Sequence, residues 1–288
     1  MCVHFLFVPI STADATEEIR VQAIEEPALD PLPPGATSRW SLGGIPWWLI
    51  GIIATIAIIA FQVVTRPIWR TGFEFIRGGL TLTLVVTLGG FVIAIVLGLV
   101  IGLARLSHSK ILQNLAMYYI EVIRGVPVLV TILFISIVGF GELWPEDLIG
   151  IDKPNKVIRG TLALGIIYAA FIAEVFRAGI ESIPAGQREA GMSIGLSNRK
   201  ILRFIVLPQA IKNIMPALGN DLIALLKDSS LVSIIAVREL TQMTKLWTGS
   251  SFQFMPGYLM LTGFYLTLTI SLSLLLRWYE KRISTPGH

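Results

Sequence analysis

Residues 189–210, EAGMSIGLSNRKILRFIVLPQA, form a polar island that is broken by glycine. Three basic residues, Arg199, Lys200 and Arg203, lie close together in it, whereas the stretches on either side are mostly apolar. A polar segment between apolar stretches indicates one of two things: an amphipathic loop that rests at lipid headgroups, or a loop whose ligand is another protein.

The composition is that of a polytopic membrane protein. Hydrophobic residues make up 54% and charged residues 15% of the 288 residues, and the mean hydropathy is +0.73. A soluble domain carries about 25% charged residues. The net charge of +4 needs no nucleic-acid partner, because basic residues at a cytoplasmic membrane boundary account for it.

Metal and thiol chemistry are not expected. Cys2 is the single cysteine, so no disulfide forms within the chain. The three histidines are far apart in sequence and have no metal-ligand spacing. We therefore predict neither catalytic residues nor a metal site.

Six segments are apolar and long enough to cross a bilayer core, which takes about 20 residues of helix. The predicted fold is all-α, a polytopic membrane helix bundle of about six transmembrane helices, one N-terminal extra helix and a core of five. The acidic, proline-rich tail before them, residues 1–42, is expected to be disordered. The spans are residues 47–64 (within an N-terminal helix at 43–66), 78–104, 111–141, 160–180, 213–237 and 246–276, the last helix beginning near Pro256.

One face of the second span is expected to pack closely on another helix. Gly90, Ala94, Gly98 and Gly102 recur every four residues, which lets a neighbouring helix approach. Lys and Arg are more numerous on the side that holds the N-terminal tail and residues 189–210, which places both termini and this loop in the cytoplasm.

The polar loop has signals for a short helical hairpin. Pro184 suits the first turn of a helix, and Gly195 suits a left-handed residue that ends one. Ser197 or Asn198 can cap a second helix. Pro208 is expected to stop or kink that helix, because it lacks an amide proton.

The spacing of this loop resembles the "EAA---G---------I-LP" motif of ATP-binding cassette (ABC) importer permeases. The matching residues are Glu189, Ala190, Gly191, Gly195, Ile205, Leu207 and Pro208, with Gly191 standing where the motif prefers alanine. Other stretches are similar to the polar amino acid permeases of that family: GLTLTLVVT (79–87), EVIRGVPVLV (121–130), AEVFRAGIESIPAGQREAG (173–191) and LLKDSSLVSIIAVREL (225–240).

The resemblance covers about residues 76–280 and implies the transmembrane domain of a type I importer, with the coupling loop at about residues 181–212. It implies a non-catalytic subunit that binds no cofactor, in the cell inner membrane. Its implied partners are ABC ATPase subunits that use ATP, a second permease subunit (identical or paralogous), an extracytoplasmic amino-acid-binding protein and membrane lipid. The chain itself lacks the G-x-x-x-x-G-K-[ST] phosphate loop of an ATPase.

Ionisable residues within the spans are candidates for the substrate path. A charged side chain inside a membrane raises the free energy unless it is paired with an opposite charge or hydrated in a water-filled path. Two pairs three residues apart, Glu121 with Arg124 and Glu174 with Arg177, can instead neutralise themselves. The stronger candidates are Asp221, Lys227, Asp228, Ser229 and Ser230, since a zwitterionic amino acid needs both a cation and an acceptor. Structural pairing remains open for these residues as well.

The positions of these residues around the penultimate helix indicate which of them faces the substrate path. Asp221 and Asp228 are two turns apart and share a face, whereas Lys227 points about 100° away from Asp228. We favour Asp228 for the path and Lys227 for a partner helix or second subunit. The alternative function is an ion-coupled secondary transporter of small polar solutes, which normally shows repeated halves that this sequence lacks.

Overall fold

The computed structural model describes residues 47–144 and 152–283. It divides into two compact units, residues 1–50 and 51–288, and the second unit holds almost all of the described helices. The predicted disorder of residues 1–42 lies outside the described residues. In chain order the elements are α1 (Trp47–Thr65), α2 (Pro67–Ile76), η1 (Arg77–Gly79), α3 (Leu80–Arg105), α4 (Lys110–Gly125), α5 (Val128–Leu133), η2 (Phe134–Glu142), α7 (Lys156–Glu181), α8 (Ala185–Ser193), α9 (Asn198–Ile201), η3 (Leu202–Val206), α10 (Leu207–Asp228), η4 (Ser229–Ile235), α11 (Leu240–Ser251) and α12 (Phe254–Ile283).

The all-α membrane bundle is confirmed, and the described residues contain no strand. Four helical segments of the described chain are long and apolar enough to span a membrane: Pro67–Arg105, Lys156–Glu181, Asn198–Ile235 and Phe254–Glu280. The predicted third span is broken, because α4 and the α5–η2 segment meet at 111° beside Pro127; the pair is either one bent span, which would be the fifth, or a re-entrant loop. The first predicted span is a shorter apolar helix, Leu49–Thr65, so the count of six stays a prediction.

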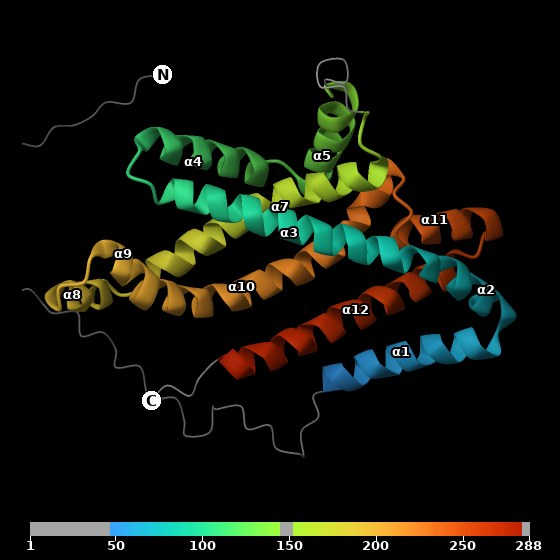
Figure 1. Cartoon of the computed structure of the whole chain (residues 1–288). Helices are drawn as coiled ribbons and strands as arrows, with labels where there is room; N and C mark the ends of the chain where they lie inside the picture. The colour runs from blue at the N-terminus through green and yellow to red at the C-terminus, as the bar shows by residue number, and fades with distance from the viewer. Residues whose placement is uncertain (1–46, 145–151, 284–288) are drawn as a thin grey trace, which may run out of the picture. The chain divides into compact units, whose positions relative to one another are not determined.

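The centre of the second unit is the contact of α3 with α7, which lie side by side (Figure 1). Gly98 explains the close approach: a Cβ there would lie 2.8 Å from Cγ2 of Ile172, and one at Gly102 would lie 3.0 Å from the carbonyl oxygen of Ala173. The predicted small-residue face is confirmed, since Gly90, Ala94, Gly98 and Gly102 are all buried.

Two helices, α2 and α11, were not predicted from the sequence. The first is amphipathic rather than apolar, and buries Trp69, Gly72 and Ile76. The second contains Lys245, and its C-terminal part lies in the uncharged stretch that runs on into α12; the break between the two helices is Phe252, with a left-handed φ of 58°. The start of α12 at Phe254 agrees with the helix start expected near Pro256.

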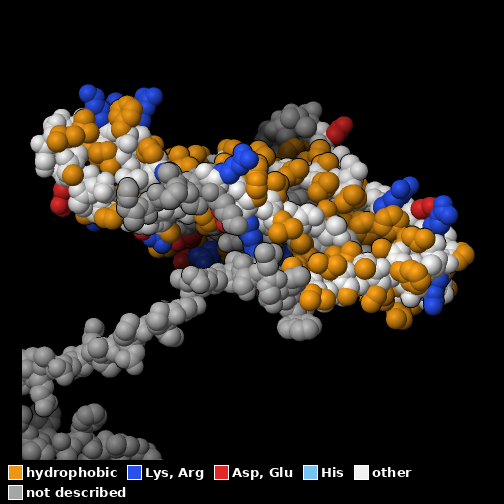
Figure 2. Space-filling view, turned by 90° about the horizontal axis from the view of Figure 1, so that it is seen from below, with side chains coloured by type: hydrophobic (Ala, Val, Ile, Leu, Met, Phe, Trp, Pro, Cys, Tyr) orange, Lys and Arg blue, Asp and Glu red, His pale blue; other side chains and the backbone are white. Residues whose placement is uncertain are grey.

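Consecutive connections of the second unit alternate between two ends of its helices. The α8–α9 hairpin lies at the same end as the α3–α4 connection, and α2 and α11 lie at the other end (Figure 1). On the face shown in Figure 2, hydrophobic side chains cover most of the middle, and Lys and Arg gather mainly towards these ends. This separation positions the polar hairpin away from the apolar part of the bundle.

Candidate functional site

The polar island folds as a helical hairpin of α8 and α9. Pro184 is the residue before α8, and Gly195 ends the first arm with a φ of 77°. Two hydrogen bonds close the turn, from Gly195 N to Met192 O (2.9 Å) and from Leu196 N to Gly191 O (3.1 Å). The left-handed conformation predicted for Gly195 is confirmed, and Ser197 precedes α9 as expected.

Gly191 is the contact point between the arms. It is the buried residue of α8, and a Cβ there would lie 2.9 Å from Cγ1 of Ile201 and from Cδ1 of Ile205. A small residue at this motif position is therefore required by packing.

The outer surface of the hairpin is exposed and partly apolar. Glu189 and Ala190 are exposed on α8, Ile194 is 74% exposed at the turn, and Phe204 is 65% exposed on the second arm. Exposed apolar side chains on a polar loop form a contact surface that suits another protein or the membrane surface.

Of the stop or kink expected at Pro208, the stop is not found, and the helical geometry changes just before this residue. Instead α9 continues through the π-helical turn η3 into α10 as one segment, Asn198–Ile235. Pro208 lies in the first turn of α10, where its missing amide proton costs little. Leu207 is 37% exposed beside it, and Ile205 is half-buried.

The acidic face predicted on the penultimate span lies against α7. The hydroxyl of Tyr168 donates a hydrogen bond to Oδ2 of Asp228 at 2.8 Å, and Asp221 interacts electrostatically with the same tyrosine. Oδ2 of Asp221 is buried and has no hydrogen-bond partner among the described residues. The two carboxylates therefore share a face, and one of them has an unused acceptor.

Lys227 points to a different side of α10. It is exposed, and with Ser230 it lines a cavity of about 400 Å³ that also contains Thr241 and Tyr265. Ser229 is fully buried and donates to Leu226 O at 2.7 Å, so it lies in the core rather than on that cavity. The structure thus divides the predicted cluster between two sides of one helix.

The charges near the end of α7 form a network. Arg177 Nη2 lies 2.8 Å from Oε2 of Glu174, as the spacing predicted, and also pairs with Glu181. Arg105, at the end of α3, lies 2.7 Å from Oε1 of Glu174, a contact that was not predicted because the two residues are 69 positions apart.

Glu121 and Arg124 are both exposed and make no ion pair with each other in the described part of the chain. Arg124 instead lies over the ring of Phe171, with 5.6 Å from Cζ to the ring centroid. Self-neutralisation therefore applies to the pair on α7 and not to the pair on α4.

A buried acid outside the spans, Glu239, was also missed. It is fully buried and precedes α11, where its carboxylate accepts from the amides of Thr241 and Gln242, each at 2.8 Å, and from the Tyr265 hydroxyl at 3.1 Å. Burial raises the pKa of this carboxyl, and the two backbone amides partly offset that rise. The sequence signal was an acidic residue directly before a helix start.

No cluster of His, Cys, Asp or Glu that could hold a metal occurs in residues 47–144 and 152–283. The features described are an exposed helical hairpin, a continuous helical segment from that hairpin, and charged groups within spans. They are features of a polytopic membrane protein.

Comparison with known proteins identifies the family. The family model described as "Binding-protein-dependent transport system inner membrane component" matches residues 90–285. The chain belongs to this family: it is a non-catalytic transmembrane permease subunit of an ABC importer.

Individual proteins with similar sequences or structures belong to the same kind of transporter. The chain is 34% identical to the probable amino-acid permease protein YxeN of Bacillus subtilis, over 75% of this chain and 94% of that protein. It is 33% identical to the glutamine transport system permease protein GlnP of Escherichia coli, over 71% and 91%. A crystal structure of an amino acid ABC transporter with histidines matches with a TM-score of 0.66 at 35% identity, over 73% of this chain and 94% of that one.

Proposed function

We propose that this chain forms the translocation pathway of an importer for polar amino acids. The names of the relatives support this cargo class, since they are amino-acid and glutamine permeases, and the similar solved structure is an amino acid transporter with histidines. An extracytoplasmic binding protein delivers the cargo, and a second permease subunit, identical or paralogous, completes the pore. This chain binds no cofactor, because ATP is used by partner subunits.

The observation that carries the coupling role is the α8–α9 hairpin. Its positive-φ glycine, its packed Gly191 and its exposed Ile194 and Phe204 make a firm, partly apolar surface beside Glu189. We infer that an ATPase subunit docks on Glu189, Ala190 and the turn, while Ile205, Leu207 and Pro208 join that contact to α10.

Gly195→Val tests this role, because a β-branched side chain tolerates a φ of 77° poorly. Nothing lies within 4 Å of the added Cβ, so the effect is on the backbone of the turn alone. We expect a subunit that inserts at normal levels but imports cargo poorly and retains less co-expressed ATPase on purification. Gly195→Asn is the matched control, since asparagine adopts this conformation more readily.

Glu189→Lys changes the charge of the same exposed surface without touching the turn. Reduced ATPase retention is expected here too. Intact import and intact ATPase retention in both Gly195→Val and Glu189→Lys would show that the hairpin is not the motor contact.

The substrate path is proposed along the Asp221–Asp228 face of α10. Its support is the unused acceptor of Asp221 and the Tyr168 hydroxyl, which together make a polar wall within an apolar bundle. Lys227 and Ser230 line the separate cavity at α11 and α12, which fits a partner-facing role. Glu121, Arg124, Glu174 and Arg177 are secondary candidates near the ends of their helices.

Cysteine scanning of residues 224–233, after Cys2→Ser, tests this assignment. Water-soluble thiol reagents should label one helical stripe that contains position 228, and delivery of cargo should change the labelling. A labelled stripe that contains position 227 and excludes 228 would move the path to the other side of α10.

A further inference from the structure

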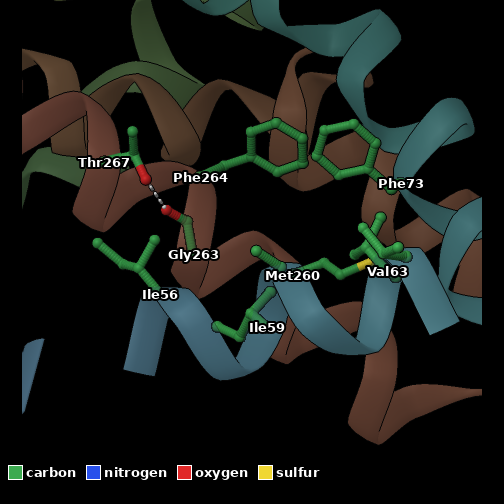
Figure 3. A pocket seen from close by; sticks show the side chains of 10 residues that line it. Ile56, Ile59, Val63, Phe73, Met260, Gly263, Phe264 and Thr267 are labelled. Atoms are coloured by element: carbon green, nitrogen blue, oxygen red, sulfur yellow. Dashed lines mark hydrogen bonds between the residues drawn. The ribbon is translucent and has the colours of Figure 1, made fainter. Parts of the chain in front are cut away.

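A two-part groove lies among α1, α2 and α12, where neither the coupling hairpin nor the charged face of α10 reaches. Its larger part is a cavity of about 350 Å³. Ligand pockets of proteins measure about 300–1,000 Å³. The cavity is lined by Ile56, Ile59, Ala60, Val63, Val64, Phe73, Met260, Gly263, Phe264 and Thr267 (Figure 3).

This lining is apolar, and its inner part is firmly packed, whereas Val64 at its rim is 82% exposed. Phe73 and Phe264 stack with their ring centroids 5.1 Å apart, and Met260 and Ile59 are at most 9% exposed. Thr267 brings a hydroxyl, but this group donates to the carbonyl oxygen of Gly263 at 2.8 Å (Figure 3). The cavity therefore suits hydrocarbon.

The second part of the groove is charged. A neighbouring cavity of about 320 Å³ shares Val63, Val64 and Phe73 with the first, and is completed by Arg70, Glu74 and Arg77. Arg70 lies 3.3 Å from Glu74, and these side chains are 74% and 54% exposed. The guanidinium of Arg77 has no hydrogen bond or ion pair to any described residue, so the charged part carries one more cation than anion.

We propose that this groove binds one anionic phospholipid, with an acyl chain in the apolar cavity and the phosphate at Arg70 and Arg77. The two cavities share three residues, so one molecule with both a hydrocarbon and an anionic part fills them together. An apolar partner helix would cover the first cavity but would leave Arg77 without an anion. Arginine binds phosphate through charge-assisted hydrogen bonds, and the adjoining apolar cavity removes acyl-chain surface from water.

The test uses the full chain, purified in detergent and mixed with equal amounts of phosphatidylglycerol and phosphatidylcholine, with retained lipid counted by native mass spectrometry. We expect about one phosphatidylglycerol per chain to survive extended washing, in preference to phosphatidylcholine. Arg70→Gln with Arg77→Gln should reduce this retention roughly tenfold or more, because each basic residue contributes to binding of anionic headgroups. Arg238→Gln, an exposed arginine outside the groove, is the matched control.

Two further variants separate the parts of the site. Ala60→Trp fills the apolar cavity and should reduce retention of both lipids. Added glycerol 3-phosphate should not displace the bound lipid, because this competitor has no acyl chain. Arg70→Lys with Arg77→Lys keeps the charge and checks that lost retention is not misfolding. Equal retention of the two lipids, or an equal loss in Arg238→Gln, would overturn the proposal.

Discussion

Single backbone positions fix how the segments of this permease meet. Gly79 is the clearest case, because a Cβ there would lie 2.5 Å from the carbonyl carbon of Glu239 and 2.6 Å from the amide nitrogen of Leu240. Backbone atoms cannot move aside as a flexible side chain can. The amide of Leu240 also donates to Oγ1 of Thr83 at 3.1 Å, which holds the two segments in register.

Gly79→Ala should therefore lower stability by about 1–3 kcal/mol, the usual cost of overpacking. Gly78→Ala is its control, since a Cβ there meets only the end of Met243 at 3.6 Å. The measurement is the apparent thermal unfolding midpoint of the purified chain in detergent. Equal midpoints for the two variants would contradict the close contact with Glu239.

The Tyr168 hydroxyl is predicted to matter for Asp228. Tyr168→Phe removes the donor and leaves a half-buried carboxylate without that partner, a change that costs about 1–3 kcal/mol. We expect normal insertion with reduced import. Tyr119→Phe is the control, because Tyr119 donates to the carbonyl oxygen of Ile166 and not to an acid. If import falls equally in both variants, the hydrogen bond from Tyr168 to Asp228 has no specific role in import.

At the level of helices, the contact of α3 with α7 depends on interlocking small and branched residues. Gly98→Leu should separate the helices, because Ile172 already fills the space that a Cβ would need. We expect a loss of folded protein and a midpoint lower than that of Val100→Leu, a change on the exposed face of the same helix.

Combining Gly98→Leu with Ile172→Ala should recover part of the loss, since the second change makes room for the first. The readout is the coupling free energy of the double-mutant cycle. Strictly additive effects would mean that the two residues do not meet.

The sequence predicted helices well where a strong local signal existed. The small-residue repeat of α3, the glycine turn at Gly195 and the apolar stretch of α7 were all visible in the residues. The helices α2 and α11 were not, because α2 is amphipathic and the end of α11 overlaps the apolar stretch of α12, from which only the left-handed Phe252 divides it.

Contacts across the bundle were harder to predict. Arg105 with Glu174, Tyr168 with Asp228, and Tyr265 with Glu239 join residues 26 to 69 positions apart, so no local pattern reveals them. The split of Lys227 from Asp228, in contrast, follows from helix geometry and was expected.

Over the whole molecule, the test that matters is topology. We predict six spans with both termini cytoplasmic, since the side that holds the hairpin carries the larger share of Lys and Arg. Reporter fusions at Asp152 and Lys200 should report opposite sides, with Asp152 external. The same side for both fusions would rule out this arrangement.

The π-helical turn at Leu202–Val206 lies near the start of the helical segment Asn198–Ile235, which connects the hairpin to the charged face of α10. At about 1.5 Å per residue, its 38 residues extend roughly 57 Å from the hairpin to the far end of η4. Under the coupling role proposed above, we expect a rotation of the hairpin to reach Asp221 and Asp228 along this one helical segment, without crossing a loop. The π-helical turn holds one residue more than an α-helical turn, so we expect the segment to bend there first.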